Sequence, residues 1–129
     1  MRLPVAFGRL VVTLAFALLG VTAAFALPRS EQPVLPVVDV TYLPREVRQT
    51  LVLIRASGPF PYERDGVRFG NRERLLPPKS REYYREYTVP TPGALDRGAQ
   101  RIVCGGPATA PYVCYYTADH YRSFKRIRE

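Results

Sequence analysis

One amphipathic helical segment, followed only by strand-like segments, is the organising pattern of this sequence. Val47, Leu51 and Ile54 recur at positions i, i+4 and i+7, which is the spacing of an apolar helix face. We predict a helix over residues 44–56, because its first residue is a proline and the Ser-Gly-Pro sequence at 57–59 stops the pattern. A single helix of this kind needs a neighbouring layer to bury its apolar face.

The segments after the helix have the alternation and the turn residues of β-strands. They are 67–69, 81–89, 101–104, 113–117 and 121–127. Short strands joined by turns predict a twisted antiparallel sheet, and one helix before them predicts that the helix packs on one face of that sheet. The expected fold class is therefore α+β.

The first 26 residues have the composition of a signal peptide. Arg2 and Arg9 precede an apolar core at 10–19, and the segment ends in an Ala-Phe-Ala cleavage pattern. We predict cleavage near Ala26, secretion, and no stable membrane association afterwards. An uncleaved membrane anchor is the alternative, because residues 10–27 are long enough to span a bilayer.

The remaining chain is expected to form one small domain and to be a monomer. Residues 27–42 contain three prolines and are predicted to be a flexible lead-in, and 43–129 are predicted to fold. Cleavage removes two of the 19 Lys and Arg residues and none of the 11 Asp and Glu residues, so a net charge of +6 remains. This charge favours polyanionic partners but does not choose among nucleic acid, acidic glycans and anionic lipid.

The two cysteines of the chain flank a loop rich in glycine, alanine and proline. An exported domain favours a disulfide between Cys104 and Cys114, which would join two neighbouring strand segments and contribute about 2–3 kcal/mol. A metal site is not expected, because two cysteines and one histidine do not complete a zinc shell and the acids are not clustered.

A carboxylate inside the best strand segment raises a question about function. Alternation along 81–89 places Glu86 on the face opposite Tyr87, and pairing with the strand that begins at Arg101 can bring Arg101 to the same face as Glu86. The turn between these strands leaves Arg97 nearby. A structural ion pair on a solvated face is the alternative interpretation.

The only histidine, His120, lies between aromatic strand signals and a basic tail, and a structural role is the alternative to a catalytic one. The sequence has no nucleophile motif and no glycine-rich phosphate loop. RNA cleavage needs neither, since the 2′-hydroxyl of the substrate is the nucleophile. A carboxylate can accept its proton, an imidazolium can protonate the leaving oxygen, and arginines can stabilise the phosphate.

Three long segments carry a resemblance to a known family. They are "LP…TLVLIRASGPFPYERDGVRFGNRE", "YYREYTVPTPGALDRGAQRIV" and "YYTADHYRSF". Over about residues 43–127 the chain resembles the microbial guanyl-specific ribonucleases, the barnase-like group, and most closely the small secreted Streptomyces-type enzymes. This resemblance implies the microbial ribonuclease fold.

The resemblance also implies a role for each matching residue. Glu86 would be the general base and His120 the general acid, and Arg97 and Arg101 would bind the scissile phosphate. The implied guanine site consists of Phe69, Gly70, Asn71, Arg72, Glu73 and Tyr121. In that site Glu73 would accept from the N1–H and amino groups of guanine, and Tyr121 would stack on the base from the side opposite Phe69.

The implied activity is cleavage of single-stranded RNA 3′ to guanosine. Transesterification would form a 2′,3′-cyclic phosphate, which water would then open, with no cofactor and no metal. One alternative is a non-catalytic basic module that binds RNA or another polyanion on the same scaffold. Another is that the same enzyme serves as an antibacterial toxin, restrained in the producer by an acidic inhibitor protein of the barstar kind.

Overall fold

The structure is a computed structural model that describes residues 2–4, 8, 20–28 and 31–129. The chain divides into two units, Met1–Ser30 and Glu31–Glu129, and the helices and strands described below belong to the second. The predicted signal peptide falls largely outside the described residues, so its cleavage stays a prediction. Among the residues that are described, none belongs to a helix with the length and apolar character needed to cross a membrane.

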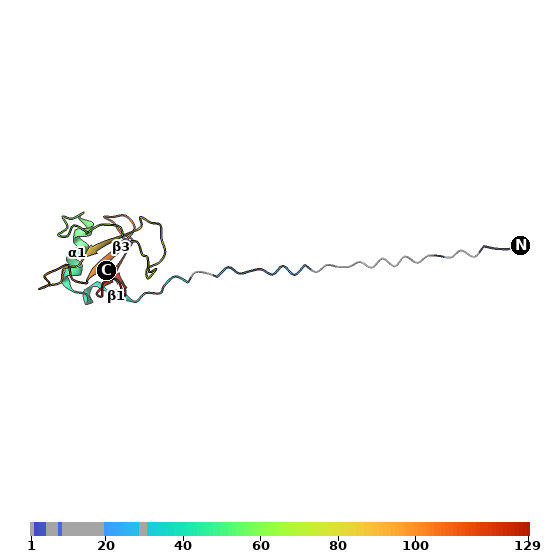
Figure 1. Cartoon of the computed structure of the whole chain (residues 1–129), viewed down its shortest axis with the longest axis horizontal. Helices are drawn as coiled ribbons and strands as arrows, with labels where there is room; N and C mark the ends of the chain where they lie inside the picture. The colour runs from blue at the N-terminus through green and yellow to red at the C-terminus, as the bar shows by residue number, and fades with distance from the viewer. Residues whose placement is uncertain (1, 5–7, 9–19, 29–30) are drawn as a thin grey trace. The chain divides into compact units, whose positions relative to one another are not determined.

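The unit Glu31–Glu129 is a five-stranded sheet with one α-helix against it (Figure 1). In chain order the elements are β1 (Val37–Asp39), the 3-10 helix η1 (Val40–Tyr42), α1 (Arg45–Arg55), β2 (Tyr84–Thr88), β3 (Arg101–Gly105), β4 (Val113–Thr117) and β5 (Lys125–Arg128). The strand order is β1-β5-β4-β3-β2, and β1 pairs with β5 in parallel while the other neighbours are antiparallel. The α+β prediction is confirmed, and the sheet is mixed because β1 is added at its edge.

Strand β1 and η1 occupy residues that the sequence assigned to a flexible lead-in. Val38 pairs with Ile127 of β5, and the backbone N–H of Arg126 donates to the carbonyl of Pro36 at 2.7 Å. Asp39 then accepts a hydrogen bond from the backbone N–H of Thr41, which starts η1. Ordered structure therefore begins at β1, before the predicted domain start at residue 43. The backbone groups of this segment find hydrogen-bond partners on the edge of β5, which the composition of 27–42 does not predict.

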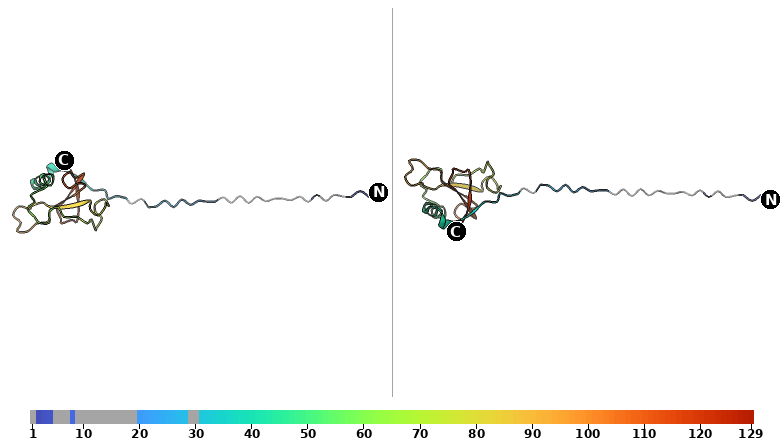
Figure 2. Two further views of the ribbon diagram at one scale, coloured as in Figure 1. Left: turned by 90° about the horizontal axis from the view of Figure 1, so that it is seen from above. Right: turned by 90° about the horizontal axis from the view of Figure 1, so that it is seen from below.

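Helix α1 begins one residue after the predicted start, because Pro44 precedes the first helical residue. Its apolar face is buried, with Val47, Leu51 and Ile54 at most 3% exposed. The two views of Figure 2 both place α1 beside the sheet. The helix ends where Gly58 takes a φ of +87° and its N–H donates to the carbonyl of Leu53 at 2.8 Å, a conformation that glycine adopts without strain.

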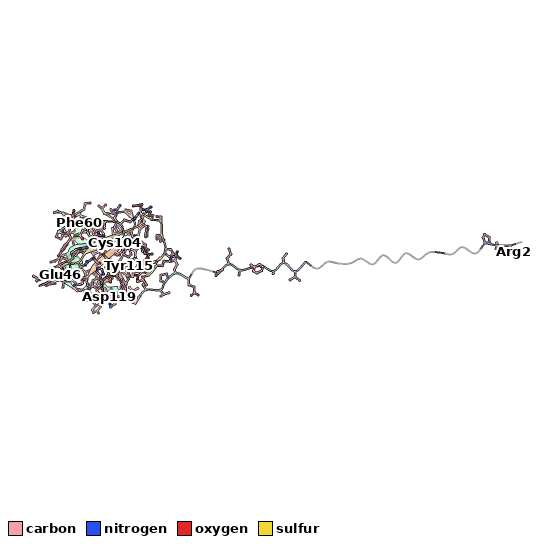
Figure 3. The ribbon with its side chains drawn as sticks, viewed as in Figure 1. Arg2, Glu46, Phe60, Cys104, Tyr115 and Asp119 are labelled. Atoms are coloured by element: carbon pink, nitrogen blue, oxygen red, sulfur yellow. A yellow bond between two sulfur atoms is a disulfide. The ribbon has the colours of Figure 1, made fainter. Side chains whose placement is uncertain are left out.

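The two faces of the sheet bury different side chains, as alternation requires. The face toward α1 carries Tyr87, Val89, Ile102, Cys104 and Tyr116. The opposite face carries Tyr84, Val103 and Tyr115, which pack with Leu76 and Phe124 from the loops. Figure 3 labels Cys104 and Tyr115, which represent these two interior layers. Polar residues that alternate with the α1-facing layer therefore lie on the loop-covered face.

The disulfide joins β3 to β4 as predicted. Cys104 and Cys114 are direct partners in the antiparallel register and are bonded to each other. The bond closes the hairpin around the loop 106–112 and fixes the register of β3 against β4. Because Arg101 lies on β3, this register also contributes to the position of the polar cluster described next.

Candidate active site

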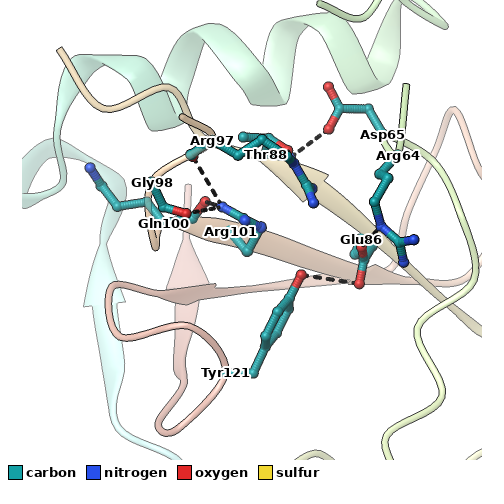
Figure 4. A network of polar contacts seen from close by, with 9 residues as sticks. All are labelled: Arg64, Asp65, Glu86, Thr88, Arg97, Gly98, Gln100, Arg101 and Tyr121. Carbon is teal, nitrogen blue, oxygen red and sulfur yellow. Dashed lines mark hydrogen bonds and ion pairs between the residues drawn. The ribbon is translucent and has the colours of Figure 1, made fainter. Parts of the chain in front are cut away.

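Glu86 lies in the middle of β2, on the sheet face away from α1, and is 7% exposed. One carboxylate oxygen, Oε2, accepts a hydrogen bond from the Tyr121 hydroxyl at 3.1 Å, and the other, Oε1, lies 3.6 Å from Arg64 Nε (Figure 4). Burial, and then the negative charge of Glu86, raise the pKa of the Tyr121 phenol, so it remains a donor at neutral pH. Glu86 is thus a nearly buried acid that is held in place from two sides.

Two arginines reach the same face, and both are held by polar groups rather than by acids. Arg97 donates from Nε and Nη2 to the hydroxyl of Thr88, at 3.1 and 2.7 Å. Arg101, which is 2% exposed, donates from Nη1 to the carbonyls of Arg97, Gly98 and Gln100 at 3.3, 3.0 and 2.8 Å. Arg101 pairs with Thr88 in the strand register, and Thr88 shares a face of β2 with Glu86, so these arginines lie on the same side of the sheet as Glu86, whose ion pair is with Arg64.

Arg101 also retains an unused donor. Its Nε is buried, and within the part of the chain that the structure describes it has no hydrogen-bond partner. Buried donors are nearly always paired in folded proteins, so an unpaired one on a charged group points to a ligand that completes it. An anion such as a phosphate oxygen has the charge and the acceptor that this group requires.

His120 is an exposed residue of the loop 118–124, between β4 and β5. Its backbone N–H donates to the carbonyl of Ala99 at 3.1 Å, and its ring lies 4.9 Å from the ring of Tyr121. Tyr121, the next residue in the chain, links His120 to Glu86, because its ring packs against the His120 ring and its hydroxyl donates to Glu86. His120 and Tyr121 have φ of +54° and +69°, a left-handed conformation that side chains rarely adopt and that costs free energy.

Asp119 holds this loop in place. Its Oδ1 accepts from the hydroxyl of Thr117 at 2.8 Å and from the backbone N–H of Ser123 at 2.9 Å, and its Oδ2 accepts from the Ser123 hydroxyl at 2.5 Å. The hydrogen bonds from Ser123 and then Thr117 lower the pKa of Asp119 to about 2. The sequence did not identify Asp119, because only the folded loop brings its three hydrogen-bond donors, on Thr117 and Ser123, together.

The predicted guanine residues line a cavity of about 310 Å³. Phe69 is placed beside β2 because its backbone N–H donates to the carbonyl of Tyr84 at 2.9 Å, although 67–69 form only an isolated bridge and not a full strand. Residues 70–73 then turn away from the sheet, with Asn71 at a φ of +49°. Glu73 and Glu86 both line this cavity.

The side chain of Asn71 shapes the loop through two hydrogen bonds to the backbone of Leu76. Its Nδ2 donates to the carbonyl of Leu76 at 2.9 Å, and its Oδ1 accepts from the Leu76 N–H at 3.1 Å. The backbone N–H groups of 70–73 donate to no backbone carbonyl within residues 31–129. Asn71 therefore contributes to the site by holding these backbone donors in position.

Tyr121 lies against Phe69, the other ring predicted to stack on the base. The rings stack on each other, with centroids 5.4 Å apart and planes at 21°. A base between them would need the rings roughly 7 Å apart, since each aromatic contact takes about 3.5 Å. Guanine could therefore enter between the two rings only if one of them moved, and stacking of Tyr121 on the base stays a prediction.

Comparison with known proteins identifies the family. A sequence model for ribonuclease matches residues 29–128. Guanyl-specific ribonuclease Sa from Kitasatospora aureofaciens is 52% identical over 90 residues, which are 70% of this chain and 91% of that protein. The chain belongs to the guanyl-specific ribonuclease family. Ribonuclease Sa3 from the same organism is 55% identical over 85 residues, 66% of this chain but only 58% of its own length.

The solved structures agree with this assignment to the guanyl-specific ribonucleases. Ribonuclease Sa2, in a structure of its complexes with mononucleotides, superposes with a TM-score of 0.69 at 47% identity and covers 75% of this chain and 97% of its own. Another structure of ribonuclease Sa2 contains guanosine-2′-cyclophosphate and superposes with a TM-score of 0.67. The family resemblance and the enzyme class predicted from the sequence are confirmed.

Proposed function

We propose that the protein cleaves single-stranded RNA on the 3′ side of guanosine, in two stages and without a metal ion. The observation that supports this most directly is the grouping of a nearly buried acid, Glu86, with two arginines and, through Tyr121, with the only histidine. Among the described residues no group of three metal-ligating side chains is found, so the proposed mechanism uses only side chains and the substrate.

In the first stage Glu86 would accept the proton of the ribose 2′-hydroxyl. The bond from O2′ to phosphorus forms as the bond from phosphorus to the 5′ oxygen breaks, and His120 gives its proton to that leaving oxygen. In the second stage water opens the 2′,3′-cyclic phosphate, with His120 as the base and Glu86 as the acid. The hydrogen bond from Tyr121 orients the Glu86 carboxylate for both steps.

The arginines would stabilise the negative charge that grows on the phosphate. Arg97 is oriented by Thr88, and Arg101 by three backbone carbonyls, so neither guanidinium needs to reorganise when substrate binds. The unpaired Nε of Arg101 supplies a donor that a phosphate oxygen can accept.

Guanine would bind in the cavity lined by 69–73. Glu73 would accept from the N1–H and amino groups of the base, and backbone N–H groups of this loop would donate to O6, while Phe69 would contribute about 1–3 kcal/mol by stacking. Adenine offers the opposite pattern and would leave these groups unpaired. In support, the related ribonuclease Sa2 has been crystallised with a guanosine cyclic phosphate.

We propose that the protein is secreted after cleavage near Ala26. The support for export is the apolar segment that follows Arg2 and Arg9, together with the Ala-Phe-Ala pattern of the sequence. N-terminal sequencing of the exported protein tests it, and a protein that still begins at Met1 would contradict it.

The decisive assay for cleavage is digestion of single-stranded RNA with EDTA present, with the 3′-terminal base of each product mapped. We expect ends at guanosine, and a loss of several orders of magnitude in kcat for Glu86→Gln and for His120→Ala. Glu82→Gln is the matched control, because this acid lies just before β2 and is 73% exposed. Near-parent cleavage by either active-site variant would refute the assigned roles.

The same assay also tests the specificity for guanine over adenine. Glu73→Ala should lower the preference for GpC over ApC, with Glu63→Ala as the control because Glu63 lies outside the cavity lining. An unchanged preference would show that Glu73 does not recognise guanine.

A further inference from the structure

The cavity that holds the guanine loop is also lined by three arginines, Arg64, Arg68 and Arg72. Arg97 and Arg101, the proposed ligands of the scissile phosphate, are not part of this lining. The site therefore has two groups of guanidinium side chains, and Glu86 stands between them. Figure 4 shows Arg64 and Arg101 on different sides of the Glu86 side chain.

The ion pairs of the cavity arginines are loose. Arg64 Nε lies 3.6 Å from Glu86 Oε1 and its side chain is 64% exposed, and Arg68 Nη1 lies 3.3 Å from the exposed Glu82. Arg72 takes part in none of the ion pairs found between residues 31 and 129. Pairs of this kind contribute little to stability, so these guanidiniums can exchange a carboxylate for another anion.

The direction of the RNA chain indicates which anion this is. With the base at 69–73 and the 3′-phosphate at Arg97 and Arg101, the ribose has one further substituent that carries charge, the phosphate on its 5′ side. The part of the cavity that the scissile phosphate does not use carries the three arginines. Their three positive charges outnumber the two negative charges of Glu73 and Glu86 in the same lining. A phosphodiester fits this surplus of positive charge.

We propose that Arg64 and Arg68, with Arg72, form a second phosphate subsite that binds the phosphate on the 5′ side of the guanosine. The inference rests on the proposed function, since it takes the positions of the base and of the scissile phosphate from it. With this subsite the protein would prefer guanosines inside an RNA strand to a guanosine at the 5′ end of the strand.

The test compares pGpC with GpC as substrates of the purified protein. At low salt we expect kcat/KM for pGpC to exceed that for GpC by about fivefold, because several exposed charge contacts act together. The double variant Arg64→Gln/Arg68→Gln should bring this ratio close to one. Arg45→Gln/Arg128→Gln is the matched control, since it also removes two positive charges, from side chains that are 76% and 68% exposed and lie outside the cavity lining, and the ratio should persist.

Salt gives an independent readout, because contacts of exposed arginines are screened. The pGpC advantage of the parent protein should shrink as salt rises, whereas the ratio in the double variant, already close to one, should change little. A ratio near one in the parent protein, or an advantage that survives in the double variant, would refute the subsite. An advantage of GpCp instead of pGpC would place the second phosphate on the 3′ side and would also refute it.

The two proposals fail in different ways. If the parent protein cleaves GpC but gains nothing from the 5′-phosphate, only the subsite is wrong. If the parent protein does not cleave GpC at all, the proposed function is wrong and the subsite falls with it.

Discussion

Thr88→Val is the substitution that most sharply tests how the phosphate-binding arginines are positioned. The Thr88 hydroxyl accepts two hydrogen bonds from Arg97, and the residue is 2% exposed on β2. Valine has nearly the same shape and keeps the strand, but it has no acceptor for the guanidinium. The substitution therefore frees Arg97 without removing a group that would touch the substrate.

The expected loss of activity follows from the two hydrogen bonds between Arg97 and Thr88. A hydrogen bond to a charged group contributes about 1.5–3 kcal/mol, but Arg97 is only half-buried and water can replace part of what is lost. We expect a loss of about 1–2 kcal/mol in transition-state stabilisation, which corresponds to a decrease of roughly 5–30-fold in kcat/KM. The free energy of unfolding should change by about 1 kcal/mol or less, because Arg97 is half-buried and water can accept from the donors that Thr88 releases.

The assay measures kcat/KM on GpC, inhibition by 3′-GMP, and unfolding in urea for the same preparations. Thr88→Ser restores the acceptor and should return most of the activity and of the inhibitor affinity, which a role in packing alone would not explain. If Thr88→Val keeps kcat/KM within twofold of the parent, Thr88 does not position Arg97 for catalysis. A fall in activity that merely parallels a large loss of stability would also contradict the reasoning.

Two further predictions concern stability. Replacing Cys104 and Cys114 together by alanine should lower the free energy of unfolding by about 2–3 kcal/mol, measured by urea denaturation, and an unchanged midpoint would show that the bond does not constrain the unfolded chain. Asp119 has a pKa lowered from 3.8 to about 2, so the stability that it contributes is present above pH 4 and is lost as the pH falls toward 2. Asp119→Asn should therefore melt at a lower temperature than the parent at pH 6, and the difference should close by pH 2; a difference that stays constant over this range would count against the ionised aspartate as the support of the loop.

Local sequence patterns were sufficient to predict much of the fold and part of the candidate active site. The spacing of Val47, Leu51 and Ile54 predicted α1, and alternation along 81–89 placed Glu86 on the face away from the helix. These features depend on periodicities of 3.6 and 2, which the chain carries locally. The pairing of Cys104 with Cys114 was also predictable, because the bond needed only two adjacent strands.

Features that depend on the folded environment were not predictable in this way. The edge strand β1 exists because β5 presents a row of backbone groups to it, and no residue of 37–39 encodes that neighbour. The packing of Tyr121 on Phe69 depends on the left-handed backbone at 120 and 121, which Asp119 supports from inside the loop. The family resemblance supplied the identity of Tyr121 but not its contact with Phe69.

The sequence by itself determined the residue types of the chemistry, their order along the chain, and the sheet face on which Glu86 lies, because alternation and composition are properties of neighbouring residues. Tertiary structure alone decided that Thr88 orients Arg97, that Arg101 is buried with a free donor, and that Arg64 stands beside Glu86 across the cavity. The physical reason is that hydrogen bonds and charge contacts act over a few ångströms, while the residues that make these contacts are up to 22 positions apart in the chain.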